Sequence, residues 1–102
     1  MIGPENITSF SHSTVNFRCT SDRSADIYWK YAVNAGDGDL VSIFDKHGRN
    51  DERFDDRFLK TVHGSTTYLT IRDVQTSDAG SYFCRDETSR GYHSAQLTVI
   101  GM

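Results

Sequence analysis

The sequence predicts an all-β protein in which two antiparallel sheets pack face to face as a sandwich. Short segments with alternating apolar and polar residues recur along the chain, at intervals of about ten residues, as expected for half-buried strands separated by turns. No stretch has apolar residues at the helical spacing of three and four. About eight or nine such strands favour a sandwich or a barrel, and Cys19, Trp29 and Cys84 decide between the two.

The strands can be placed in order along the chain. Val15, Phe17 and Cys19 alternate with polar residues and predict the first clear strand. Further strands are expected within residues 27–33, 40–44, 68–72, 82–84 and 97–99. A Gly- and Asp-rich loop at 34–39 makes the strands at 27–33 and 40–44 a hairpin. Residues 46–52 are polar and predict a connection or a weak edge strand, and residues 75–80 have turn chemistry.

Length and charge indicate one domain that spans residues 1–102 and has no affinity for nucleic acid. The 102 residues carry a net charge of −3, with acidic and basic side chains mixed along the chain. A nucleic-acid-binding protein would concentrate Lys and Arg on one face. The chain has no apolar run of the roughly 20 residues that cross a bilayer, and no signal peptide precedes Met1. The chain is then either cytosolic or, as the cysteines favour, a domain of a longer secreted or membrane protein.

The cysteines and the tryptophan carry a resemblance to a known family. Trp29 follows Cys19 by ten residues, and Cys84 ends the stretch Asp78-Ala79-Gly80-Ser81-Tyr82-Phe83-Cys84, which looks like the motif D-x-G-x-Y-x-C. With these features nearly the whole chain resembles the V-set, the variable-type domains of the immunoglobulin superfamily. The separation of the cysteines leaves room for the extra strands of the variable type rather than the shorter constant type.

The resemblance implies specific structural roles. Cys19 and Cys84 would form a disulfide between the sheets, with Trp29 packed on it; two free cysteines in a cytosolic protein are the alternative. Closing that loop would contribute on the order of 4 kcal/mol to stability. The remaining structural residues are a tyrosine corner, a salt-bridged pair at one end of the sandwich and a core leucine: Tyr82, Arg57, Asp78 and Leu69.

The resemblance also implies a binding site at the loop tip. Three connections would gather there, at residues 20–26, 45–50 and 85–92. In the last of these, one Arg and one Tyr stand among adaptable polar residues, a composition similar to that of antibody binding loops. The predicted binding residues of the loop tip are Asp86, Glu87, Arg90 and Tyr92. An ordinary hydrophilic hairpin loop is the open alternative.

A second binding surface is predicted on the outer face of one sheet. If Trp29, Tyr82 and Cys84 point into the core, their neighbours must point outward, and Phe44 is expected outward if Ile43 points inward. Exposed aromatic side chains that cluster mark a partner site. The predicted residues of this face are Tyr28, Lys30, Phe44, Phe83 and Arg85. Long neighbouring loops that fold over these side chains are the alternative.

The sequence departs from antigen-receptor V domains at the start of the last strand. Those domains carry Phe-Gly-x-Gly there, whereas this chain has Gly91-Tyr92-His93-Ser94. An antibody-like pair of domains is therefore disfavoured, and the chain is more similar to a non-rearranging V-type receptor domain such as the amphioxus VJ-like proteins. The predicted partner is a protein ligand or another V-type domain, including a homodimer through the sheet face. Homophilic cell adhesion, or packing within a longer ectodomain, is the second hypothesis.

Catalysis and cofactors are not indicated. Four histidines lie in four separate segments without ligand spacing, and the acidic clusters at 37–39 and 51–56 lack the spacing of an EF-hand. Phosphate-binding and nucleophile motifs are missing as well. Asn6-Ile7-Thr8 is an N-glycosylation sequon. The sequence thus predicts an extracellular binding domain without enzymatic activity, cofactor or direct membrane contact, with Asn6 as a possible glycan acceptor.

Overall fold

A computed structural model describes residues 2–21, 27–32, 41–45, 48–49, 56–86 and 92–101. Within these ranges the chain forms strands and one short 3-10 helix. In order they are β1 (Ile7–Phe10), β2 (Val15–Thr20), β3 (Ile27–Ala32), β4 (Val41–Asp45), β5 (Gly48–Arg49), β6 (Phe58–His63), β7 (Thr66–Ile71), η1 (Thr76–Asp78), β8 (Gly80–Asp86) and β9 (His93–Ile100). The predicted alternation therefore does correspond to strands, and the predicted weak edge strand is β5.

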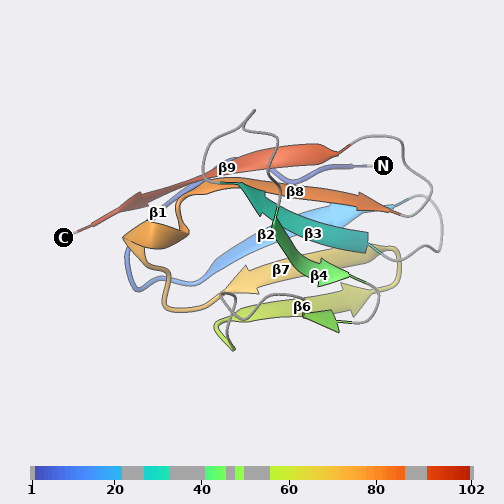
Figure 1. Cartoon of the computed structure of the whole chain (residues 1–102), viewed down its shortest axis with the longest axis horizontal. Coiled ribbons are helices and arrows are strands. Elements are labelled where there is room, and N and C mark those ends of the chain that lie inside the picture. Colours follow the sequence, from blue (N-terminus) through green and yellow to red (C-terminus); the bar gives the residue numbers. More distant parts are fainter. Residues whose placement is uncertain are drawn as a thin grey trace.

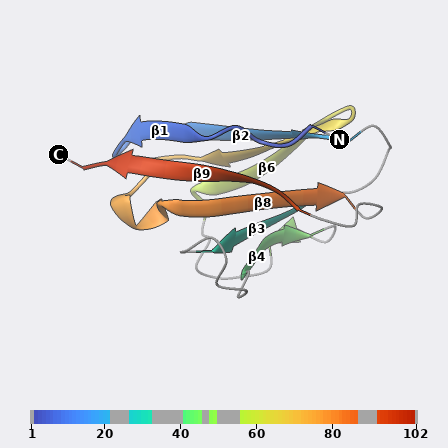
Figure 2. The ribbon, with the colours of Figure 1, turned by 90° about the horizontal axis from the view of Figure 1, so that it is seen from above.

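The strands form two layers, which confirms the predicted sandwich. One sheet has the order β1-β9-β8-β3-β4-β5, and the other has the order β2-β7-β6 (Figure 1). All neighbouring pairs are antiparallel except β1 and β9, whose arrows point the same way in Figure 2. This parallel pair arises because the N-terminal segment begins beside β2, where Ile2 pairs with Thr20, and then crosses to the other sheet.

The core lies between the two sheets and contains Cys19, Cys84, Trp29 and Leu69 of the predicted structural residues. Cys19 and Cys84 form a disulfide, and both are fully buried together with Trp29 and Leu69. Each buried side chain as large as Leu contributes about 1.5–3 kcal/mol through its removal from water. The disulfide joins β2 to β8, so it ties one sheet to the other across this apolar layer.

One end of the sandwich is closed by a hydrogen-bond network around Asp78. Arg57 donates to both carboxylate oxygens of Asp78, at 2.9 and 3.2 Å. The hydroxyl of Tyr82 donates to the backbone oxygen of Asp78 at 2.6 Å, which confirms the predicted tyrosine corner. The backbone N–H of Gln75 donates to the same carboxylate at 2.7 Å. A buried carboxylate with this many donors stabilises the turn between β7 and β8.

Steric restriction explains why position 80 of the motif is a glycine. Gly80 has a φ of +147°, and a Cβ there would lie 2.8 Å from the backbone oxygen of Ala32 and from the ring of Tyr31. The hydroxyl of Tyr31 donates to the backbone oxygen of Ala79 at 2.6 Å, which holds the ring against this position. Only a residue without a side chain therefore fits between β3 and the turn.

The prediction that Phe44 faces outward is wrong. Phe44 is only 6% exposed and belongs to the core cluster together with Ile43. The pairing of β3 with β4 shifts between Trp29 and Lys30, so that Trp29 faces Phe44 while Lys30 faces Ser42. Ile43 is thus the extra residue of a β-bulge, and a bulge breaks the alternation of sides along a strand. Two consecutive residues of β4 consequently enter the core.

Candidate functional site: the outer face of the six-stranded sheet

The central strands β3 and β8 place four of the predicted side chains on one surface. Trp29 and Cys84 face each other and point inward. Their neighbours therefore point to the opposite side of the sheet. There Tyr28 lies opposite Arg85, and Lys30 lies opposite Phe83. These four side chains are partly exposed, as predicted.

Tyr92, the residue that precedes β9, joins these residues. Its ring meets the ring of Phe83 edge to face, with 6.1 Å between the ring centres. The ammonium of Lys30 lies 5.6 Å from the centre of the same ring, and the guanidinium of Arg85 lies 5.3 Å from it. Tyr92 is 38% exposed. We call Tyr28, Lys30, Phe83, Arg85 and Tyr92 the outer-face cluster.

The guanidinium of Arg85 lies between two aromatic rings. It is 5.3 Å from the ring centre of Tyr92 and 5.7 Å from that of Tyr28. Contacts of this kind contribute about 0.5–1 kcal/mol at exposed sites and more where water is excluded. The Nε–H group of Arg85 is buried and has no hydrogen-bond acceptor among the residues that the structure describes. Two rings thus hold a cation that is already partly removed from water.

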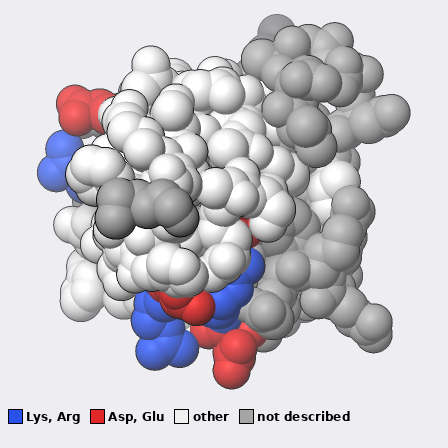
Figure 3. Space-filling model, turned by 90° about the vertical axis from the view of Figure 1, so that its left-hand side faces the viewer, with Lys and Arg blue, Asp and Glu red and all other residues white. Residues whose placement is uncertain are grey.

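The charges of the cluster differ from those at the η1 end of the sandwich. At that end Arg57 pairs with Asp78, and His12 lies 2.7 Å from Asp73. Figure 3 shows this end, where basic and acidic side chains lie next to each other. Within the described part of the chain, neither Lys30 nor Arg85 forms an ion pair. The cluster therefore combines positive charge with aromatic surface.

The structure corrects one residue of the predicted loop tip. Asp86 is 2% exposed and accepts a hydrogen bond from the hydroxyl of Ser21 at 2.6 Å. It is the last residue of β8 and pairs with Ile27, so the strand continues past the expected start of the loop. Because Asp86 follows Cys84 by two positions, it points inward like that cysteine. The predicted binding residues Glu87 and Arg90 lie outside the described residues.

Comparison with protein families matches residues 2–100 to the immunoglobulin V-set domain. The chain belongs to the immunoglobulin V-set family. V-set domains are in general binding modules without enzymatic activity that mediate protein–protein contacts, and they are typically extracellular. Among the described residues, no helix has the length and apolar character needed to cross a membrane.

Tyr92 is the member of the outer-face cluster that the sequence analysis did not place on this face. It was expected at the loop tip, but in this V-set domain its ring lies against Phe83 and Arg85. The signal was present in the strand pairing, because Ser94 lies opposite Phe83 on the outer face. Tyr92 precedes Ser94 by two positions and so shares its side.

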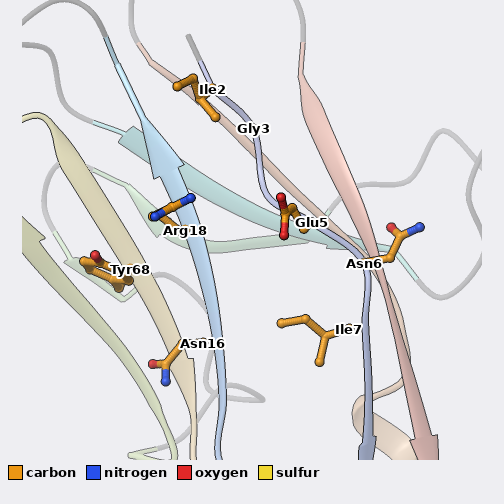
Figure 4. A pocket seen from close by; sticks show the side chains of 8 residues that line it. All are labelled: Ile2, Gly3, Glu5, Asn6, Ile7, Asn16, Arg18 and Tyr68. Carbon is orange, nitrogen blue, oxygen red and sulfur yellow. The ribbon is translucent and has the colours of Figure 1, made fainter.

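The structure also contains a hollow that the sequence did not predict. Its volume is about 270 Å³, and it lies between the N-terminal segment and the strands β2 and β7. Figure 4 shows Glu5, Asn16, Arg18 and Tyr68 around it. It forms where the N-terminal segment leaves its pairing with β2 and crosses to pair with β9. Because Glu5, Asn16 and Arg18 are exposed, the hollow lacks the buried polar groups that orient a small ligand.

Asn6 lies at the edge of the same sheet as the outer-face cluster. Its side-chain oxygen accepts a hydrogen bond from the backbone N–H of Gln96 in β9, at 2.8 Å. In Figure 4 the Asn6 side chain points away from the hollow. The residue is exposed, so its amide is accessible from solvent.

Proposed function

We propose that this V-set domain is an extracellular recognition module of an immune-type receptor that binds a protein partner through the outer-face cluster. One observation carries the proposal: three aromatic side chains and two cations gather on one side of the sheet and stay partly exposed. Aromatic and arginine side chains are enriched at the energetically important centres of protein interfaces.

The loop that follows β8 belongs to the same proposal. Glu87 and Arg90 would supply polar contacts at the rim, next to Tyr92. Polar rims around an aromatic centre exclude water from the contacts that carry the affinity. The narrower resemblance to the non-rearranging amphioxus VJ-like proteins stays a prediction.

A second candidate function is that of a packing module within a longer ectodomain. Phe10 and Ile100 lie opposite each other on β1 and β9, and they are 57% and 44% exposed. An exposed apolar pair at the end of a sheet favours contact with another domain. Homophilic adhesion through the outer-face cluster is the other form of this alternative.

Staining of cells with fluorescent tetramers of the oxidised domain tests the first proposal. Phe83→Ser and Tyr92→Ser should each abolish staining of cells that the wild type stains, because each removes an aromatic contact at the centre of the interface. Val62→Ser is the matched control, since Val62 is an exposed apolar residue on β6 of the other sheet. Staining that survives both cluster substitutions would contradict the proposal.

Sedimentation over a concentration series separates the alternatives. A dimer that Phe83→Ser dissociates would favour homophilic adhesion through the outer-face cluster. A dimer that only Phe10→Ser dissociates would instead favour the packing module. A monomer at every concentration is the result expected for a receptor whose ligand is a different protein.

A further inference from the structure

We infer that the outer-face cluster recognises an acidic protein surface, and therefore a different protein rather than a second copy of this chain. The inference rests on the proposed function, because it names the chemistry of the partner for that same face. Lys30 and Arg85 supply the positive charge, and Tyr28, Phe83 and Tyr92 supply the apolar surface around it.

The first argument is charge complementarity. Lys30 and Arg85 contact aromatic rings and form no ion pair within the described part of the chain. By contrast, Arg57, which directly precedes β6 of the other sheet, has a carboxylate partner, Asp78. A carboxylate from outside is the group that two unpaired cations in an aromatic setting bind best, since such pairs gain from partial exclusion of water.

The second argument is the state of Arg85 before any partner arrives. Rings on both sides hold the guanidinium in place, so little side-chain entropy is lost on binding. The Nε–H group is buried without an acceptor among the described residues, so part of the hydration has already been given up. The planar guanidinium can present its remaining N–H groups to a carboxylate in a forked arrangement.

The third argument concerns a second copy of the chain. A two-fold dimer brings the same patch of both molecules together. In a dimer whose two-fold axis passes through the cluster, Lys30 and Arg85 would face the Lys30 and Arg85 of the other copy. Like charges opposed in an interface disfavour the complex. Self-pairing centred on this cluster is therefore disfavoured.

The negative net charge of the chain makes the binding of a polyanion informative. The whole chain carries −3, so on average it repels a polyanion. Attraction to an acidic probe must therefore come from a local positive surface rather than from the overall charge. This contrast allows a simple polymer to serve as the probe.

The test measures binding of poly-L-glutamate, of about 20 residues, to the immobilised oxidised domain at several salt concentrations. The wild type should bind, and more weakly as salt rises. Arg85→Gln and Lys30→Gln should each weaken binding about tenfold, in line with the loss of one charge-assisted hydrogen bond. Arg85→Lys should be intermediate, because the charge stays and the fork is lost. Thermal unfolding of each variant checks that it is folded.

The matched control is Arg18→Gln. Arg18 is an exposed cation on β2 of the other sheet, and its replacement changes the net charge equally. Binding should remain at the wild-type level in this variant. If Arg18→Gln weakens binding as much as Arg85→Gln does, or if heparin binds as tightly as polyglutamate, the attraction is general and the inference is overturned.

Two further outcomes separate this inference from the proposed function. If polyglutamate does not bind, yet tetramer staining depends on Phe83 and not on Arg85, the cluster is a binding site whose partner is not acidic. The inference then fails and the proposed function stands. If staining is insensitive to Phe83, Tyr92 and Arg85, both fail. Self-association of the wild type that is lost on Phe83→Ser and weakened by Lys30→Gln would likewise overturn the inference, because Lys30 would then support the pairing of two copies.

Discussion

At the scale of single residues, Asp78 and Tyr82 show how one turn can close the end of a sandwich. The Asp78 carboxylate accepts from the Arg57 guanidinium and from the Gln75 backbone, and its backbone oxygen accepts from Tyr82. Burial raises the pKa of the Tyr82 hydroxyl above its ordinary value of 10.0, and the charge of Asp78 adds to the rise. The tyrosine is therefore held in its protonated, donating form.

Replacing Tyr82 by Phe should lower the free energy of unfolding at pH 7 by about 1–2 kcal/mol, because the buried oxygen of Asp78 loses its donor. The pH dependence should change as well. In the wild type Tyr82 stays protonated in the folded state but ionises in the unfolded state as the pH rises through about 10. Its contribution to the free energy of unfolding is therefore fully present below pH 10 and decreases above it. The slope from this residue is up to about 1.4 kcal/mol per pH unit.

Urea unfolding between pH 8 and 11, in the range given by the ordinary tyrosine pKa of about 10, measures both effects. Tyr82→Phe should reduce the alkaline slope, while Tyr31, whose pKa burial and then Asp78 also raise, keeps a part of it. Tyr68→Phe, on β7, is the control and should retain the wild-type slope because Tyr82 and Tyr31 are untouched. An unchanged slope in Tyr82→Phe would contradict the assignment.

Asn6 is a second residue with a testable consequence. Gln96 engages only the amide oxygen of Asn6, and an N-linked glycan is attached through the amide nitrogen. We therefore propose Asn6 as a glycan acceptor in the secreted protein. Secreted from eukaryotic cells, the wild type should exceed Asn6→Asp in mass by one glycan that an amidase removes. Asn6→Asp keeps the acceptor oxygen, so stability should be retained; equal masses would rule out glycosylation here.

At the scale of elements, β4 shows how a single irregularity changes which side chains reach the surface. Its bulge sends Ile43 and Phe44 into the core, where regular alternation would expose one of them. The outer-face cluster is consequently built by β3, β8 and the residue before β9, without an aromatic side chain from β4. The centre of the cluster lies over the middle strands and away from the β4 edge.

Because Phe44 is a core residue, Phe44→Ala should lower the free energy of unfolding. Removal of a buried phenylalanine costs about 3–5 kcal/mol, because a cavity is left as well as lost apolar contact. Phe83→Ala, at a partly exposed position, should cost considerably less. Urea unfolding of the two variants side by side checks this, and equal losses would argue against the buried position of Phe44.

At the scale of the whole molecule, two thin sheets must share one small core. The disulfide between Cys19 and Cys84 spans 65 residues of sequence and joins β2 to β8. It restricts the unfolded chain, which has far more conformations without the link. For a domain whose net stability is about 5–15 kcal/mol, the disulfide supplies a considerable fraction.

The double variant Cys19→Ala with Cys84→Ala should lose on the order of 4 kcal/mol of unfolding free energy. Urea denaturation of the oxidised wild type and of the double variant measures the difference. Both cysteines are fully buried, so a reducing agent added without denaturant should reduce the disulfide of the folded wild type only slowly. Slow reduction of the folded wild type is the control for the burial of the disulfide. A loss below about 1 kcal/mol would show that the unfolded chain is already compact.

Much of the architecture could be predicted from the sequence alone. Alternation in β2, β3 and β7 placed Phe17, Trp29 and Leu69 in the core, because the two-residue period of a strand follows from its backbone geometry. The motif that ends at Cys84 specified the turn, since Gly80, Asp78 and Tyr82 each meet a local steric or hydrogen-bonding requirement. The fold and the four positions Tyr28, Lys30, Phe83 and Arg85 of the outer face followed from these local rules.

Other features depended on contacts between segments that are far apart in sequence. The bulge that buries Phe44 reflects how β4 pairs with β3, and the continuation of β8 to Asp86 depends on its pairing with β3 and on Ser21. The contact of Tyr92 with Arg85 and Lys30 exists only because β9 lies beside β8. Local sequence determines which residues can face a core, whereas the partner strand decides the register and the ends of a strand. Register and strand ends brought Tyr92 next to the cations Lys30 and Arg85.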